Sequence, residues 1–72
     1  MGLNQSLHPA NPLIAPALLT VPEAMAALRL SRATVYELIR SGELGSITIG
    51  RSRRIPTEAV QTFVARLVEA AR

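Results

Sequence analysis

A helical period of hydrophobic positions begins just after Thr20. The segment Thr20-Val21-Pro22-Glu23 has the spacing of a capping box, in which the Thr hydroxyl and the Glu carboxylate each accept a hydrogen bond from a free backbone amide. The apolar positions that follow recur at i, i+3, i+4 and i+7 and form one buried face: Val21, Ala24, Met25 and Leu28. A helix is therefore predicted to begin at this box.

A second helix is predicted almost immediately after the first. Arg29 and Leu30 leave a very short connection before Ser31, a residue type that caps the amino termini of helices. A new apolar face follows, made of Val35, Leu38 and Ile39. The pattern ends at Gly42, which is suited to the left-handed conformation just past a helix end. Two short capped helices joined by a tight turn are the outline of a helix-turn-helix.

A short alternating segment comes next. Ile47 and Ile49 are predicted to face one side of the strand, and Ser46 and Thr48 are predicted to face the other. Gly50-Arg51 predicts a tight turn before a return strand through Arg53-Arg54-Ile55. The segment is therefore predicted to form a small β-hairpin.

The strongest periodic signal in the chain lies in its final segment, from Pro56 or Thr57 onward. One helical stripe there contains Ala59, Val60, Phe63, Val64, Leu67 and Val68. Its last turns, with Leu67, Val68 and Ala71, extend beyond what the first two helices can cover. We expect these turns either to contact a neighbour or to form a partly exposed end. The predicted core rests mainly on Leu28, Val35, Leu38, Ile39, Phe63 and Leu67.

The first seventeen residues differ from the rest of the chain. They carry no charged side chain, include three prolines and show no sustained period. Little apolar surface therefore offsets the entropy of ordering them. We expect a flexible arm over residues 1–17 and one small domain over residues 18–72. At the boundary, Leu13-Ile14 and Leu18-Leu19 are expected to fold back onto the domain or onto a neighbouring protomer.

Positive charge is concentrated in the middle of the chain. The net charge is +3, and all eight basic residues are arginines. Six of them lie between Arg29 and Arg54, where there are only two glutamates. A concentrated basic surface is typical of a protein that binds a polyanion, although a basic domain of another kind would share the net charge.

The composition argues against an enzyme, a metal site or a cofactor site. There is no cysteine and no aspartate, and the lone His8 has no ligand partner nearby, so we expect it to be a solvated residue of the arm. The five glutamates show no paired arrangement for acid and base catalysis. No apolar stretch approaches the roughly 18 residues of a membrane span. The amino terminus also lacks the layout of a secretory signal.

Three motifs lie in order over about residues 18–67. They are Leu19-Thr20-Val21 with Glu23-Ala24, then Ser31-x-x-Thr34-Val35-Tyr36-x-Leu38-Ile39-x-x-Gly42-x-Leu44, then Ile49-Gly50-Arg51-x-x-Arg54-Ile55-Pro56. Together they resemble the excisionase-type helix-turn-helix domain. The resemblance implies a MerR-like winged helix-turn-helix, mainly α with a small β-hairpin: a helix-turn-helix, a two-stranded wing and a C-terminal helix.

Two residues depart from the pattern of this family. Arg53 stands where the family often has an aromatic residue that packs at the base of the wing. Either its stem covers the same apolar patch while its guanidinium reaches out, or the wing is looser and more basic than usual. Gly45 stands where a proline or a larger residue is frequent, which predicts a more mobile entry to the wing.

The amino-terminal part of the second helix is expected to meet base edges in the major groove of DNA. The candidate residues are Ser31, Arg32, Ala33, Thr34, Tyr36, Glu37 and Arg40. Arg32 is suited to a bidentate contact with guanine, while Thr34 and the Ala33 methyl suit thymine or a phosphate. Two positions stay open. Tyr36 either contacts the DNA backbone or is partly buried, and Glu37 either accepts from a cytosine amino group or pairs with Arg40.

The wing is the second candidate contact. Its residues are Arg51, Ser52, Arg53 and Arg54, and they surround a glycine turn. A hairpin tip with guanidinium groups can enter a minor groove or clamp phosphates. The alternative is an edge strand that charge protects from aggregation.

The resemblance implies two functions that use double-stranded DNA as the partner. The first is an excisionase that binds attachment-site DNA, several copies head to tail, and bends it so that a cognate integrase favours excision. The second is a small transcriptional regulator of the prophage or plasmid type, and an adjacent integrase gene would favour the first. Neither function uses catalytic residues, a metal, a cofactor or a membrane. The expected location is cytoplasmic, at the nucleoid when the protein is bound to DNA.

Overall fold

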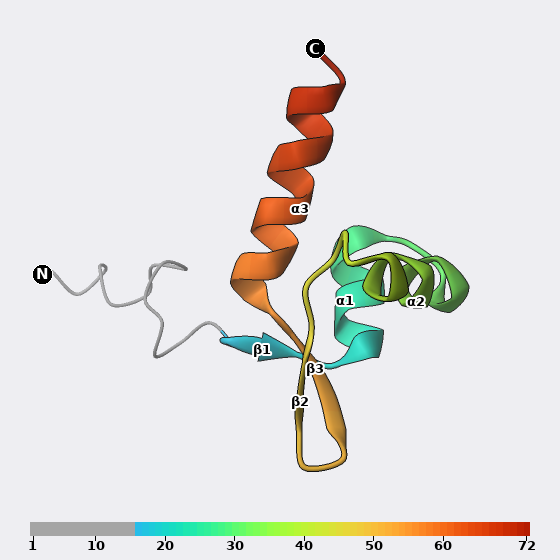
Figure 1. Ribbon diagram of the computed structural model, residues 1–72, viewed down its shortest axis with the longest axis vertical. Helices are drawn as coiled ribbons and strands as arrows, with labels where there is room; N and C mark the ends of the chain where they lie inside the picture. The colour runs from blue at the N-terminus through green and yellow to red at the C-terminus, as the bar shows by residue number, and fades with distance from the viewer. Residues whose placement is uncertain (1–15) are drawn as a thin grey trace, which may run out of the picture.

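The computed structural model describes residues 16–72, so the part of the predicted arm up to residue 15 lies outside the described residues. Within residues 16–72 the chain forms three helices and three short strands (Figure 1). In order these are β1 (Leu18–Leu19), α1 (Val21–Leu28), α2 (Arg32–Ser41), β2 (Ile47–Ile49), β3 (Ser52–Pro56) and α3 (Thr57–Ala70). This arrangement confirms the predicted winged helix-turn-helix.

Helix α1 begins at the predicted capping box. The Glu23 amide donates to Thr20 Oγ1 at 3.2 Å, and the Thr20 amide donates to Glu23 Oε1 at 2.8 Å. Both amides would otherwise lack a partner at the helix start. The helix ends at Arg29, whose φ of 57° is left-handed although the residue is not glycine. This conformation costs roughly 1–2 kcal/mol, and it reverses the chain within the very short connection to α2.

Helix α2 has the two ends that the sequence predicts. The Thr34 amide donates to Ser31 Oγ at 3.2 Å, so Ser31 is the amino-terminal cap. Gly42 has a φ of 85°, and its amide donates to the Ile39 carbonyl at 3.1 Å. Glycine adopts this left-handed conformation without the steric cost that a Cβ brings. Helices α1 and α2 pack on each other as the helix-turn-helix (Figure 1).

The sheet has one more strand than the predicted two-stranded wing. Its strand order is β1-β3-β2, with both pairs antiparallel. In β2 and β3, Ile49 lies opposite Ser52 across a two-residue turn, and Gly50 there has the positive φ of 62° that a type II′ turn requires. Strand β1 pairs Leu19 with Ile55, which confirms that Leu18-Leu19 folds back onto the domain, while Leu13-Ile14 lies outside the described residues.

The start of α3 is joined to the segment that leads into β1. Pro56 precedes the helix and makes no side-chain cap. Instead, Thr57 donates from its hydroxyl to the Pro16 carbonyl at 2.7 Å and from its amide to the Ala17 carbonyl at 3.0 Å. These two bonds fix the direction in which α3 leaves the sheet.

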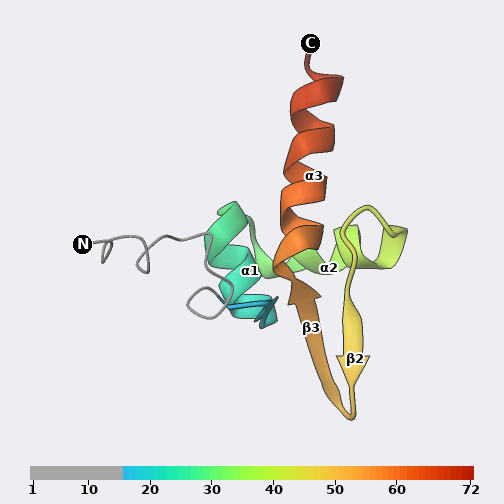
Figure 2. The same cartoon turned by 90° about the vertical axis from the view of Figure 1, so that its left-hand side faces the viewer.

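The core contains residues from every helix, from β3 and from the connection before β2. Its members are Val21, Ala24, Val35, Leu44, Ile55 and Phe63. Two of them, Leu44 and Ile55, are at most 1% exposed and are absent from the predicted core. Leu67 is 52% exposed, so its place in the predicted core was wrong, whereas the expectation that the last turns of α3 extend beyond the cover of the other helices was correct. The physical reason is visible in Figures 1 and 2, where the later turns of α3 project past the other elements.

The last turns of α3 extend beyond the cover of the other elements, as predicted. Val64 is 41% exposed and Val68 is 52% exposed, so the apolar stripe continues beyond the core. Among residues 16–72, no helix has the length and apolar character needed to cross a membrane.

Candidate nucleic-acid interface

All seven positions predicted for DNA contact on α2 and at its cap are exposed. They are Ser31, Arg32, Ala33, Thr34, Tyr36, Glu37 and Arg40. The residues between them face the other way, because Val35 is fully buried and Leu38 and Ile39 pack against the core. Tyr36 is 36% exposed, so the residue is partly covered and partly accessible.

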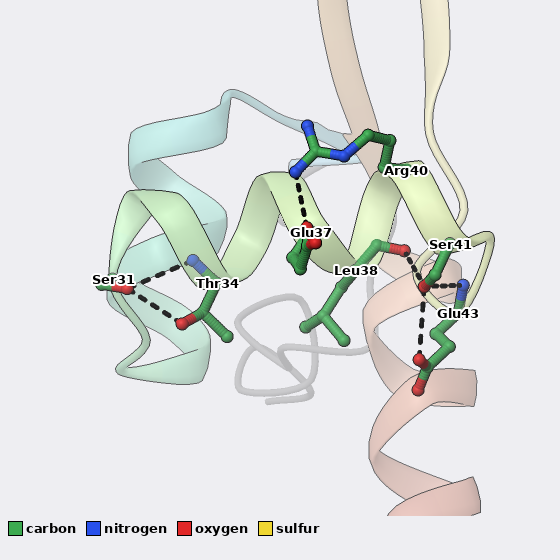
Figure 3. A network of polar contacts seen from close by, with 7 residues as sticks. All are labelled: Ser31, Thr34, Glu37, Leu38, Arg40, Ser41 and Glu43. Carbon is green, nitrogen blue, oxygen red and sulfur yellow. Dashed lines mark hydrogen bonds and ion pairs between the residues drawn. The ribbon is translucent and has the colours of Figure 1, made fainter.

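The amino terminus of α2 is ordered by a small hydroxyl network (Figure 3). Ser31 Oγ accepts from the Thr34 amide and lies 3.0 Å from Thr34 Oγ1, to which it donates. The first helical hydrogen bond runs from the Val35 amide to the Ser31 carbonyl at 3.0 Å. The amides of Arg32 and Ala33 therefore point out of the helix end, where the helix dipole is positive. An anion such as a DNA phosphate is stabilised at this position.

The face of α2 one turn further on carries an ion pair. Arg40 Nη2 contacts Glu37 Oε1 at 2.5 Å, and both side chains are about two-thirds exposed, at 69% and 67%. Pairs this exposed contribute only about 0–1 kcal/mol, because water screens them. Either group can therefore exchange this partner for a base or a phosphate at low cost.

The carboxyl end of α2 positions the entry to the wing (Figure 3). The Ser41 hydroxyl donates to the Leu38 carbonyl at 3.1 Å and accepts from the Glu43 amide at 3.3 Å. The Leu44 amide donates to the same Leu38 carbonyl at 3.1 Å. These bonds seat Leu44 in the core. This small network was not predicted, although Ser41-Gly42-Glu43 at the end of the helix was a local signal for it.

The wing projects from the body as a narrow hairpin (Figure 2). Arg51, Ser52 and Arg53 are exposed and Arg54 is partly buried. Arg53 Nη1 donates to Ser46 Oγ at 2.8 Å, which joins the two sides of the hairpin. An exposed hydrogen bond thus occupies the position where the family often has aromatic packing.

Strand register decides which side of the wing faces the core. Residues directly opposite each other in a sheet share a face. Arg53 lies opposite Thr48 and alternates with the fully buried Ile55, so this face is the inner one. Ile47 and Ile49 are on the outer face and are 42% and 55% exposed. The predicted alternation is confirmed, with the isoleucines turned away from the core.

The charge of the wing is uniform in sign. From Leu44 to Pro56 the chain has three arginines and no acidic residue. The wing tip and the carboxyl end of α3 lie at opposite ends of the molecule (Figures 1 and 2).

Among the described residues, no cluster of three His, Cys, Asp or Glu side chains has the arrangement of a metal site.

An exposed second helix beside a basic hairpin defines the class of winged helix-turn-helix proteins. The helix-turn-helix domain family matches residues 18–68. An excisionase of Streptomyces ambofaciens is 53% identical over 51 residues, which cover 71% of this chain and 82% of that protein. The chain therefore belongs to the excisionase-type helix-turn-helix DNA-binding family.

A second relative extends the comparison. A protein of Saccharopolyspora erythraea named "Probable excisionase" is 51% identical over 51 residues, which cover 71% of this chain and 52% of the relative. The chain thus spans about half the length of that protein. No solved structure matches the chain.

Proposed function

We propose that this protein acts as an excisionase. It binds attachment-site DNA in a sequence-specific way and bends it, so that an integrase favours excision. The observation that carries the proposal is the 53% identity to an excisionase over most of that protein's length. Both relatives described above bear this name, which favours recombination over transcriptional regulation.

The second helix supplies base recognition in this proposal. The amino terminus of α2 enters the major groove, the usual position of a recognition helix. Arg32 reaches guanine, Thr34 and the Ala33 methyl face thymine or a phosphate, and the free amides of the helix end hold a phosphate. Ser31 keeps the helix end ordered through its bonds to Thr34. Tyr36, Glu37 and Arg40 line the next turn and contact the backbone or a base edge.

The wing supplies affinity and bending. Arg51, Ser52, Arg53 and Arg54 lie along the hairpin that projects beside the helix-turn-helix (Figure 2). Guanidinium groups are attracted to the negative potential of a narrow minor groove. The protein carries out no catalysis of its own in this scheme, and the recombinase supplies the chemistry.

Several copies act together in the proposal. One module of this size covers little DNA, so a single copy binds weakly. Neighbouring copies placed head to tail on adjacent sites raise one another's effective concentration. A direct contact with the integrase would raise the effective concentration of the protein at its sites in the same way.

Binding should weaken steeply as salt rises. Each phosphate neutralised by an arginine lowers the binding constant by about 0.9 log units per log unit of salt. Titrating one-site and multi-site duplexes at several salt concentrations measures this slope and the cooperativity together. Binding that does not respond to salt would contradict the proposed role of the arginines. Equal affinity per site on both duplexes would contradict cooperation between copies.

The variant Arg32→Ala should relax base preference. Losing a bidentate base contact costs about 1–3 kcal/mol on the preferred site and leaves non-specific affinity nearly intact. Arg40→Ala is the comparison on the same helix, since in this proposal Arg40 exchanges its exposed bond to Glu37 for a phosphate. It should weaken binding to all duplexes by a similar small factor. Uniform weakening by Arg32→Ala would instead assign Arg32 to a phosphate.

A further inference from the structure

The outer face of the wing carries two isoleucines that pack against nothing in the core. Ile47 and Ile49 are 42% and 55% exposed, and neither is among the apolar residues packed on the core. Their β-branched side chains suit a strand. Strand propensity alone does not require an apolar residue, however, because threonine has the same branching. The two isoleucines therefore leave apolar surface available to a partner.

The surroundings of these isoleucines favour a polyanionic partner. Arg54 lies opposite Ile47, and Arg51 lies in the turn beside Ile49. No acidic residue lies between Leu44 and Pro56. A second copy seated on this face through its own wing would place guanidinium groups against one another. DNA would pair them with phosphates.

Ile49 is the better placed of the two for insertion. It adjoins the turn at the tip, and its cross-strand neighbour is the small Ser52, whereas Ile47 has the longer Arg54 beside it. The hairpin beneath it is held by the turn at Gly50 and, on the opposite face, by the bond from Arg53 to Ser46. A supported apolar side chain at a basic tip has the features of a minor-groove wedge. Such wedges partly unstack a base step and kink the duplex.

We propose that Ile49 is an apolar wedge that enters the minor groove at a base step and makes the wing bend DNA. The wedge rests on the proposed function, and it identifies the residue that produces the bend in the DNA. It also adds a source of specificity. Pyrimidine–purine steps unstack more easily than others, so they should be favoured beneath the wing although no base edge is read there.

Two threonine substitutions test the wedge. Ile49→Thr keeps β-branching and strand propensity but removes apolar surface. Val68→Thr makes the same kind of change at a site on α3 with similar exposure, 52% against 55%. The probes are short duplexes that carry one binding site, selected beforehand with the wild-type chain. In separate duplexes, each base step that flanks the site is changed to TA or to GC. Four quantities are measured for all three proteins: affinity, salt slope, melting temperature and bend angle. The bend angle is measured by energy transfer between the duplex ends.

The wedge predicts a specific combination of results. Ile49→Thr should bind the one-site duplex about tenfold more weakly, which corresponds to about 1.4 kcal/mol. Its salt slope and melting temperature should match the wild type, while the bend and the preference for a TA step should decrease. Val68→Thr should match the wild type in all four measurements on this duplex.

Other results would overturn the wedge. If Ile49→Thr binds and bends the one-site duplex like the wild type, Ile49 is not a wedge. If it loses only cooperative binding on a multi-site duplex, the face contacts a neighbouring copy instead. Either result leaves the proposed function standing, provided that the wild type binds duplexes with a salt-dependent affinity. A wild-type chain that binds no duplex would overturn both.

Discussion

Replacing Arg51, Arg53 and Arg54 together with serine should leave the protein folded and weaken its binding to every duplex. None of the three belongs to the core, so the substitutions create no cavity. If each arginine neutralises one phosphate, the salt slope should fall by up to about 3 units. Base preference set by α2 should persist. Circular dichroism and salt-dependent titration measure these two effects separately, and bending should decrease as well.

The three single variants separate charge from structure within the wing. Arg51→Ser should affect DNA binding alone. Arg53→Ser also removes the hydrogen bond to Ser46, which joins the two sides of the hairpin, whereas Arg54→Ser removes only a bond to the carbonyl of the adjacent residue. Arg53→Ser should therefore lower the melting temperature more than Arg51→Ser or Arg54→Ser. An exposed hydrogen bond contributes little, about 0.5–1.5 kcal/mol, but small domains have little stability in reserve. Unchanged affinity in all three singles and in the triple variant would mean that the wing does not touch DNA.

Truncating Leu44 to alanine should destabilise the fold severely. Leu44 is 1% exposed and is among the largest fully buried side chains. Removing a buried leucine side chain beyond Cβ costs about 2–5 kcal/mol. A core of this size rarely supplies more than about 3–5 kcal/mol in total. A large fraction of Leu44→Ala should therefore be unfolded at room temperature, and urea unfolding followed by circular dichroism measures this directly.

Leu67→Ala is the matched control, because it makes the same chemical change at an exposed site. Leu67 is 52% exposed, so its truncation should change the free energy of unfolding by about 0.5 kcal/mol or less. DNA binding to a one-site duplex should be unchanged. Equal destabilisation by the two substitutions would contradict the packing described here and would support the periodic pattern, which placed Leu67 in the core.

Much of the candidate site follows from local sequence. The exposed positions of α2 follow from helical spacing once Val35, Leu38 and Ile39 are assigned to the core. The caps at Thr20 and Ser31 depend on groups only three residues apart. Interactions of this range depend mainly on the residue types nearby, so the sequence predicts them. For the same reason the basic wing could be located before its structure was known.

The apolar face of the wing could not be assigned in the same way. Alternation places Ile47 and Ile49 on one side of the hairpin but does not say which side faces the core. That choice depends on Ile55, which is buried between β1 and the helices. The isoleucines turn outward as a consequence. A candidate DNA contact was therefore missed, because its exposure depends on a residue on the opposite strand.

The sequence by itself determined the order of the three helices and the wing, the local caps of α1 and α2 and the polar face of α2, since these depend on neighbours within about one helical turn. Tertiary structure alone decided the pairing of β1 with β3, the burial of Leu44 and the point along α3 at which burial ends. Periodicity reports that a helix has an apolar stripe, but burial requires a second surface opposite it. The helix-turn-helix covers α3 only near Phe63, and beyond that point no other element of residues 16–72 lies against the stripe.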